Sequence, residues 1–261
     1  MCVKSIKQQL IVIVLVIFFS SGTLAEDLAA GTISEISGKY RLVFFSDWED
    51  GIPLNIEQQT VRREDITVGC AQDAQFSNQL RMKIDRNENF STLANGKPRA
   101  EIVLPANATF RLREEYLARW FTYIPADYSF ISSEIITQIH QGPASGSPPI
   151  MLALTRSGYV FRQQGAEQSS KREKDICCAA TDKAIWVRWT LRYRPDDTGN
   201  LAITQLWKDE ALVYDSRGQP NAYPKDNAAY LKLGLYIPGG WRQAKFDPVV
   251  IFYGPVWMWQ R

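Results

Sequence analysis

The chain is poor in histidine and cysteine. His140 is its only histidine, and it has four cysteines, Cys2, Cys70, Cys177 and Cys178. Their spacing matches no structural zinc site, so a zinc module is excluded. In an exported chain Cys70 can pair with Cys177 or Cys178 and leave one thiol over, although one structural disulfide or none is the simpler expectation.

An excess of charge of one sign is also missing. The sequence has 30 Lys and Arg against 28 Asp and Glu, and Lys4 and Lys7 are the only charged residues before Glu26. Without its first 25 residues the chain therefore has 28 of each sign and no net charge. Attraction to a polyanion must then come from a local cluster of cations, and we expect no nucleic-acid partner.

Long hydrophobic runs are absent apart from one near the N-terminus. Residues 10–19 are all apolar, Lys4 and Lys7 precede them, and small residues occupy positions 23 and 25. The run is shorter than the roughly 20 residues of a membrane span. It predicts a signal peptide at 1–25, and hence a secreted or periplasmic protein with no membrane attachment after cleavage. An uncleaved N-terminal anchor is the alternative.

The remaining residues, 26–261, contain no linker rich in Pro, Gly or Ser and no repeat, so we expect one domain. Short runs of alternating apolar and polar residues, separated by turn signals, predict an all-β sandwich. A short helix is expected only at 61–74. The predicted strands are 40–46, 79–84, 99–104, 109–113, 119–124, 134–141, 150–154, 159–162, 186–194, 202–207, 231–237 and 249–259.

Two of these strands carry polar residues two positions apart, which places each pair on one face of the sheet. Arg99 and Glu101 form the first pair. A carboxylate beside an arginine can hold the guanidinium so that its other donors point at a ligand carboxylate. Gln138 and His140 form the second pair. A cross-strand ion pair and a structural histidine are the simpler interpretations of each pair alone.

A third strand carries tyrosines and a lysine on one face. Leu231, Leu233 and Leu235 form its apolar face, so Tyr230, Lys232 and Tyr236 share the other face with Gly234. The glycine predicts space for a substrate backbone between Lys232 and Tyr236. A solvated face of Tyr and Lys is the alternative.

Together the three segments resemble the polysaccharide lyases of the heparin lyase I, glucuronan lyase and alginate lyase group. That group shares the patterns R-x-E, Q-x-H and Y-x-K-x-G-x-Y in the order found here, over roughly residues 44–259. The resemblance implies a concanavalin A-like β-jelly-roll of two antiparallel sheets with a concave groove. It also implies a secreted enzyme that cleaves an anionic, uronate-containing polysaccharide by β-elimination.

The resemblance further implies roles for the site residues. Arg99 and Gln138 would bind the substrate carboxylate, supported by Glu101 and Tyr230. Tyr236 would transfer protons, with Lys232 as the cation favouring its ionised form. Tyr236 alone would be base and acid where C5–H and O4 share a ring face, whereas His140 would be the base where they lie opposite.

No metal or organic cofactor is required for this chemistry, although the acidic run at 47–50 offers calcium ligands. We expect a monomer. A glycoside hydrolase would need two carboxylates flanking the scissile bond, for which no E-x-D-x-x-E run is present. A non-catalytic carbohydrate-binding protein and an alginate lyase remain as alternatives, and Val103 stands where alginate lyases of this group carry a second arginine.

The substrate is left open between unsulfated and sulfated uronans. The absence of net charge favours a glucuronan-type polymer over a heparin-like one. Sulfate recognition would require additional cations in the groove, and the candidates are Arg81, Lys83, Arg111, Arg113 and Arg162.

Overall fold

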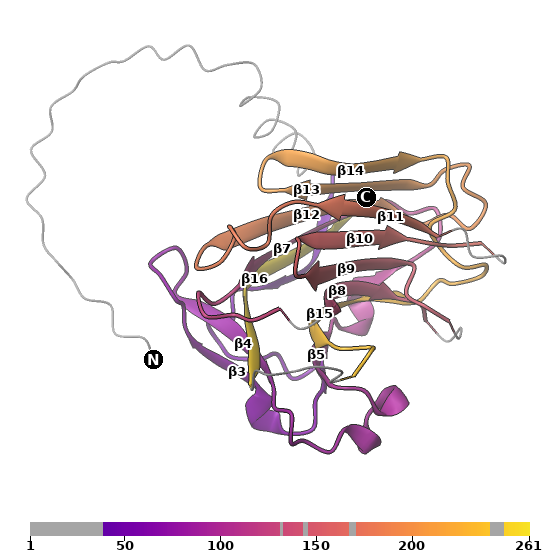
Figure 1. Ribbon diagram of the computed structural model, residues 1–261. Coiled ribbons are helices and arrows are strands. Elements are labelled where there is room, and N and C mark those ends of the chain that lie inside the picture. Colours follow the sequence, from indigo (N-terminus) through magenta and orange to yellow (C-terminus); the bar gives the residue numbers. More distant parts are fainter. Residues whose placement is uncertain (1–38, 131–132, 143–145, 167–170, 241–247) are drawn as a thin grey trace, which may run out of the picture.

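The computed structural model describes residues 39–130, 133–142, 146–166, 171–240 and 248–261 (Figure 1). The predicted signal peptide at 1–25 lies outside these residues and stays a prediction. No helix in the described ranges is long and apolar enough to cross a membrane.

Two antiparallel sheets pack face to face (Figure 1), which confirms the predicted all-β sandwich. The strands of the first sheet follow the order β14-β13-β12-β7-β16-β4-β3, with β1 paired to β16. They are β1 (Arg41–Ser46), β3 (Ile66–Cys70), β4 (Asn78–Ile84), β7 (Tyr116–Tyr123), β12 (Trp186–Arg194), β13 (Ile203–Lys208), β14 (Ala211–Arg217) and β16 (Val249–Gln260).

The second sheet has the order β11-β10-β9-β8-β15-β5-β2, with β6 paired to β15. Its strands are β2 (Glu57–Gln59), β5 (Arg99–Val103), β6 (Thr109–Phe110), β8 (Ser133–His140), β9 (Ile150–Thr155), β10 (Tyr159–Gln163), β11 (Arg172–Ile176) and β15 (Ala229–Tyr236). Short 3-10 helices occupy the connections: η1 (Arg63–Asp65), η2 (Phe90–Thr92), η3 (Ala94–Gly96) and η4 (Ala106–Ala108).

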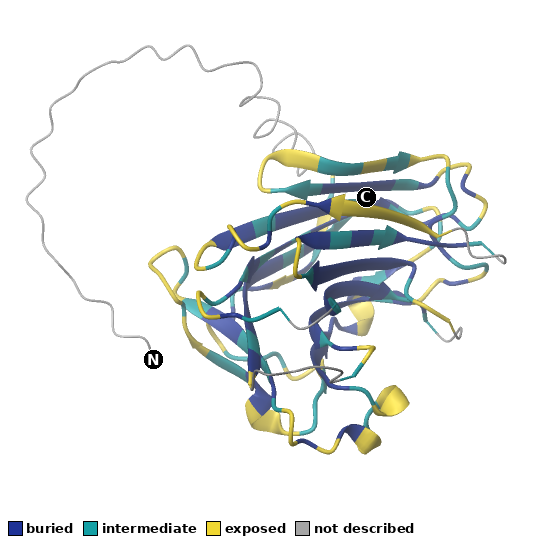
Figure 2. Cartoon of the chain, viewed as in Figure 1, coloured by how far each residue is buried: buried dark blue, intermediate teal, exposed yellow. Residues whose placement is uncertain are grey.

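Every predicted strand is present, although the one at 109–113 is shortened to β6. The helix predicted at 61–74 is wrong, because η1 is followed directly by β3. Strands β2, β3, β11 and β14 were not predicted. β11 and β14 lie at the edges of the sheets and are largely exposed (Figure 2), so their sequences lack the alternation that marks a half-buried strand.

Large aromatic and aliphatic side chains from both sheets form one core. In β12, Val187, Trp189, Leu191 and Tyr193 are all buried in it, as their alternation predicts, while Arg188 is only partly buried. The three leucines of β15 enter the same core. The opposite face of β15 is therefore left for polar side chains.

Cys177 and Cys178 are bonded to each other, so the possible pairing of Cys70 with one of them is not the one found. The disulfide follows β11 directly and lies between sequence neighbours, so it links no distant parts of the fold.

Gly234 is required by its backbone conformation and by the close approach of β5, and it does not leave space for a substrate. Its φ is +142°, and a Cβ at this position would lie 2.2 Å from the carbonyl oxygen of Ala100 on β5. The pairing of β15 with β8 also shifts register between Leu233 and Tyr236, which is a β-bulge. The predicted space for a substrate at Gly234 is thus filled by the neighbouring strand.

Gly234→Ala should destabilise the protein by about 1–3 kcal/mol from backbone strain, with the overlap on Ala100 adding to this. Urea unfolding measures the loss. Gly69→Ala on β3 is the control, because a Cβ there meets nothing within 4 Å. Equal stabilities for the two variants would show that Gly234 is not required by the fold.

Candidate functional site

Three neighbouring strands of the second sheet carry the predicted site residues. β15 lies between β8 and β5. Across β15 and β5, Tyr236 is opposite Arg99 and Gly234 is opposite Glu101. Across β15 and β8, Tyr230 is opposite His140 and Lys232 is opposite Gln138. The register therefore joins residues that are 90 or more positions apart in the sequence.

The carboxylate of Glu101 is the centre of this cluster. Its Oε1 accepts a hydrogen bond of 2.5 Å from Gln138 Nε2, and its Oε2 accepts one of 2.6 Å from Lys232 Nζ. Arg99 Nη1 lies 3.5 Å from the same Oε2. Glu101 is 1% exposed and Lys232 is 2% exposed. Charges this deeply buried require such partners, since each alone would lose its hydration.

Lys232 was expected from the sequence to be the cation that acts on Tyr236, and the structure places it elsewhere. Its ammonium contacts Glu101, whereas the cation packed on the Tyr236 ring is Arg99, 4.2 Å from the ring centroid. Arg99 is further fixed by a 2.8 Å hydrogen bond from Nη2 to the carbonyl of Ala94, in η3. Its buried Nε has no hydrogen-bond partner among the described residues.

His140 and Tyr230 form a second pair at the end of β8. Nδ1 of His140 lies 2.8 Å from the carbonyl oxygen of Gln141 and 3.1 Å from the hydroxyl of Tyr230. A carbonyl only accepts hydrogen bonds, so Nδ1 carries the proton in the neutral ring and Nε2 keeps the lone pair. The two rings are stacked, with centroids 5.4 Å apart.

The local environment shifts the pKa of three of these groups. Burial, together with the charges of Lys232 and Arg99, lowers the pKa of His140, although the Gln141 carbonyl and Glu101 oppose this. Burial lowers the pKa of Lys232 while Glu101 opposes the shift. Burial, followed by nearby carboxylates, raises the pKa of Tyr230. A neutral imidazole is thus favoured beside a buried cationic cluster.

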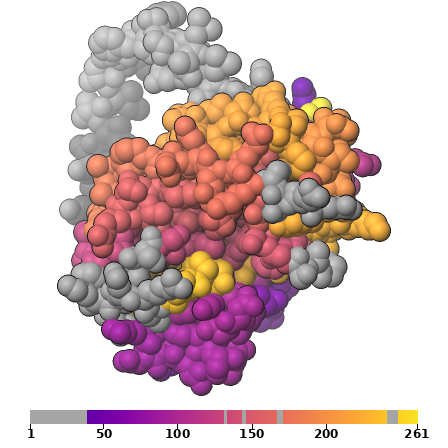
Figure 3. Space-filling model, turned by 45° about the vertical axis from the view of Figure 1, so that its right-hand side comes forward, coloured from indigo at the N-terminus to yellow at the C-terminus, as the bar shows by residue number. Residues whose placement is uncertain are grey.

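Arg99, Gln138, His140 and Tyr236 line one cavity of about 270 Å³, whereas Glu101 and Lys232 lie behind its wall. In Figure 3 the yellow-orange end of β15 reaches the surface between the purple N-terminal third and the pink strands. Residues not anticipated from the sequence complete the lining: Asn95, Ser133, Ile135, Gly146, Ser147, Pro148, Met151 and Pro238. These side chains are small, apolar or uncharged. They are not residue types that typically take part in catalysis, so nothing in the sequence indicated that they line a site.

Of the five cations considered for sulfate recognition, Arg162 alone is among the lining residues of this cavity. It is paired with Glu173 on β11 at 2.8 Å. Lys83 is instead paired with Asp85. In the acidic run at 47–50, Asp47 Oδ1 accepts a hydrogen bond from the Glu49 amide, and the calcium site suggested there stays a prediction.

Glu101→Gln should destabilise the protein by about 3–5 kcal/mol, because Lys232 would keep its buried charge without a counter-ion. Urea unfolding measures this. Asp215→Asn is the control, because Asp215 pairs with Arg217 at the surface, where loss of an ion pair costs about 1 kcal/mol or less. Similar losses in both variants would show that the Glu101 cluster does not contribute to stability.

Known proteins resemble the chain in both sequence and fold. The polysaccharide lyase family model matches residues 45–254, which is more than half of the chain. No curated protein sequence matches it. An endo-β-1,4-glucuronan lyase from the fungus Trichoderma reesei has a similar structure, with 16% identity, a TM-score of 0.65 and coverage of 84% of this chain and 95% of that one.

Two further solved structures share the fold. An alginate lyase of polysaccharide lyase family 7 has 11% identity and a TM-score of 0.54, with coverage of 79% of this chain and 94% of that one. An endo-1,3-β-glucanase from Streptomyces sioyaensis has 10% identity and a TM-score of 0.58, with coverage of 85% and 96%. These likenesses confirm the predicted β-jelly-roll, which lyases and a hydrolase share. The family match is the finding that separates these activities, and by it the chain belongs to the polysaccharide lyase family and is a polysaccharide lyase.

Proposed function

We propose that this lyase is exported and cleaves an unsulfated uronan, a glucuronan-type polymer, by β-elimination. The observation that carries the proposal is the buried charge beside the cavity. Arg99 and Lys232 contribute two positive charges and Glu101 one negative charge, and all three are almost fully buried. The excess positive charge favours an anionic group at the cavity wall.

The substrate carboxylate is the group that this excess charge suits. Gln138 uses one amide hydrogen for Glu101 and has a second, and Arg99 has donors beyond those used by Ala94 and Glu101. Removal of the C5 proton places further negative charge on that carboxylate. Donors already fixed by Glu101 stabilise this charge without reorganisation, which is the largest electrostatic contribution expected in such a reaction.

The elimination transfers one proton from C5 to a base and one proton from an acid to O4, and it breaks the C5–H and C4–O4 bonds. A base takes the C5 proton, the electron pair forms the C4–C5 double bond, and the C4–O4 bond breaks. O4 leaves with a proton from an acid. Tyr236 and His140 line the cavity from β15 and β8, and each has a group that exchanges protons.

On glucuronate C5–H and O4 share a ring face, so we assign both transfers to Tyr236. Its ring lies against the guanidinium of Arg99, which places a cation beside the phenolate formed during the transfer. Neutral His140, held through Nδ1, then directs Nε2 at the bound sugar. On a uronate of opposite C5 configuration, Nε2 would be the base.

The lining of the cavity favours an unsulfated substrate. Arg162 is its cation besides Arg99, and Arg162 is paired with Glu173, a carboxylate that it shares with Lys171. A heparin-like chain needs several free cations along the groove. The same lining argues against a hydrolase mechanism, which needs two carboxylates, because no Asp or Glu is among the described residues that line the cavity.

Incubation with glucuronan should increase absorbance at about 235 nm, because each cleavage creates a double bond conjugated to the carboxylate. Tyr236→Phe should lower kcat about 10²–10⁴-fold through loss of the proton-transferring group. Tyr123→Phe on β7 of the other sheet is the control and should keep full activity.

The same assay separates failure of the function from failure of the residue assignment. Absence of the absorbance change with glucuronan, alginate and heparin would overturn the lyase mechanism on uronans. Activity that survives both His140→Ala and Tyr236→Phe would leave the mechanism standing and overturn the residues. A preference for alginate or heparin over glucuronan would replace only the substrate.

The protonation state of His140 can be measured without a substrate. Because it is the only histidine, an untagged protein gives one imidazole signal in NMR. That signal should titrate below the ordinary value of about 6.5. Lys232→Met should raise the midpoint, because it removes a positive charge that opposes protonation. A midpoint at or above 6.5 in the wild type would contradict the neutral ring.

A further inference from the structure

The face of the first sheet that points away from the core carries a connected group of aromatic rings. Along β16 the core side chains Val256 and Met258 alternate with Trp257 and Trp259, which are only partly buried. Further rings come from β1, β7, β12 and the connection between β3 and β4, and neighbouring rings have centroids 4.9–6.4 Å apart. We call this group the outer aromatic surface, and its members are Phe45, Phe76, Phe121, Trp186, Trp257 and Trp259.

The rings of this surface are held in place and remain accessible. The ring of Phe76 lies on β16 because Gly254 leaves room for it, since a Cβ at Gly254 would be 2.8 Å from that ring. Trp257 and Trp259 have ring planes only 2° apart. Phe45, which pairs with Trp257 across β1 and β16, is 45% exposed. A contiguous apolar patch that stays exposed on a folded protein marks a site of interaction.

An arginine without a counter-ion lies within the same face. The register places Arg119 of β7 opposite Trp257 on one side and opposite Thr190 of β12 on the other. Its Nε donates a hydrogen bond of 3.3 Å to Thr190 Oγ1, whereas its Nη2 has no hydrogen-bond partner among the described residues. Burial, followed by the positive charge of Arg188, lowers the pKa of Arg119. The side chain is only partly buried, so an anion can reach it and would be favourable there.

The strands of this face supply positive charge and no negative charge. Together β1, β4, β7, β12 and β16 contain arginines and a lysine, but neither Asp nor Glu. Carboxylates from the connections balance part of this charge, in the pairs Glu115–Arg192, Glu210–Arg188 and Asp85–Lys83. At the edge of the surface Asp73 accepts a hydrogen bond of 3.1 Å from Trp186 Nε1. Arg81 of β4 and Arg119 form no ion pair with any of the described residues, so they leave uncompensated positive charge beside the rings.

We propose that the outer aromatic surface and Arg119 form a second binding surface for the acidic polysaccharide, separate from the cavity. Sugar rings present apolar C–H faces that pack on aromatic side chains, and the parallel indoles of Trp257 and Trp259 can contact successive units of one chain. A uronate carboxylate suits the guanidinium of Arg119. A second copy of this protein would bring the same unpaired arginines into the contact, whereas a polyanion neutralises them. The identity of the polymer rests on the proposed function.

The position of this surface gives it a task different from that of the cavity. The cavity lies on the face of the second sheet that points away from the core, because Tyr236 is on the side of β15 opposite its core leucines. The two sites are therefore on opposite sides of the sandwich. A short oligosaccharide occupies one of them, whereas a long chain or a polymer network engages both. Binding at the outer surface then raises the local concentration of cleavable chain at the cavity.

Affinity electrophoresis in a gel that contains long-chain glucuronan tests this surface with little cleavage. Tyr236→Phe is the parent chain and should be retarded by the polymer. Adding Trp257→Ala and Trp259→Ala should raise the apparent dissociation constant about 10-fold or more, because the second point of attachment is lost. Adding Arg119→Gln instead should weaken binding and reduce its dependence on salt. Leu201→Ala is the control, an exposed apolar residue outside the surface, and should bind as the parent does.

Kinetics at about 235 nm separate the two sites. On long glucuronan, the chain with Trp257→Ala and Trp259→Ala should have a KM about 10-fold higher than the wild type and an unchanged kcat. On a glucuronan tetrasaccharide both constants should equal those of the wild type, because the tetrasaccharide is bound and cleaved in the cavity alone. The tetrasaccharide result also shows that the variant is folded.

Three results would overturn the proposal. One is equal retardation of the tryptophan variant and its parent. Another is a parallel loss of activity on both substrates while Arg119→Gln binds as its parent does, which would mean that the rings act only through the fold. The third is a wild-type dimer in light scattering that the tryptophan substitutions dissociate, which would make this face an interface between copies. Retardation that depends on Trp257 and Trp259 in a chain that cleaves no glucuronan would keep this surface and remove only the proposed function.

Discussion

The buried carboxylate of Glu101 organises the candidate site. Lys232, Gln138 and Arg99 reach it from three adjacent strands. Lys232 and Gln138 donate hydrogen bonds to it, and Arg99 forms an ion pair with it. Because Glu101 and Lys232 lie behind the cavity wall, they act on the residues in front of them. A single carboxylate thereby aligns the amide and the guanidinium that face the cavity, and it leaves one uncompensated positive charge beside them.

The fold supplies what this arrangement needs. The leucines of β15 anchor the strand in the core, and its bulge at Gly234 brings β15 close to β5 while Tyr236 still packs on Arg99. The segment between β4 and β5 closes the cluster from the other side through the Ala94 carbonyl.

Alternation along the strands made most of the fold predictable. Period-two patterns located most of the strands, because one face of each enters the core. The patterns failed at β11 and β14, which are edge strands with little buried surface. They also failed at 61–74, where an apolar residue every few positions resembled a short helix although η1 and β3 occupy the segment. Burial generates the signal, so exposed strands carry none.

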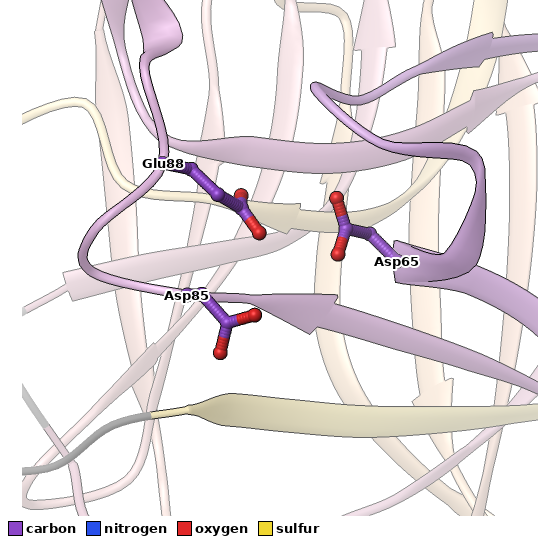
Figure 4. Close-up of side chains that lie close together, drawn as sticks. All are labelled: Asp65, Asp85 and Glu88. Carbon is purple, nitrogen blue, oxygen red and sulfur yellow. The ribbon is translucent and has the colours of Figure 1, made fainter.

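The sequence by itself determined the all-β class, and it placed Arg99 with Glu101 and Gln138 with His140 on common faces, because a strand fixes the parity of its side chains. Only the tertiary structure decided what each side chain meets. Arg99, and not Lys232, packs on Tyr236, and Gly234 makes room for β5 and not for a sugar. The carboxylates of Asp65, Asp85 and Glu88, which point toward one another in the structure (Figure 4), could likewise not be recognised as a set from the sequence. Pairing order, register and connections between sheets set these contacts, and they depend on residues far apart in the chain.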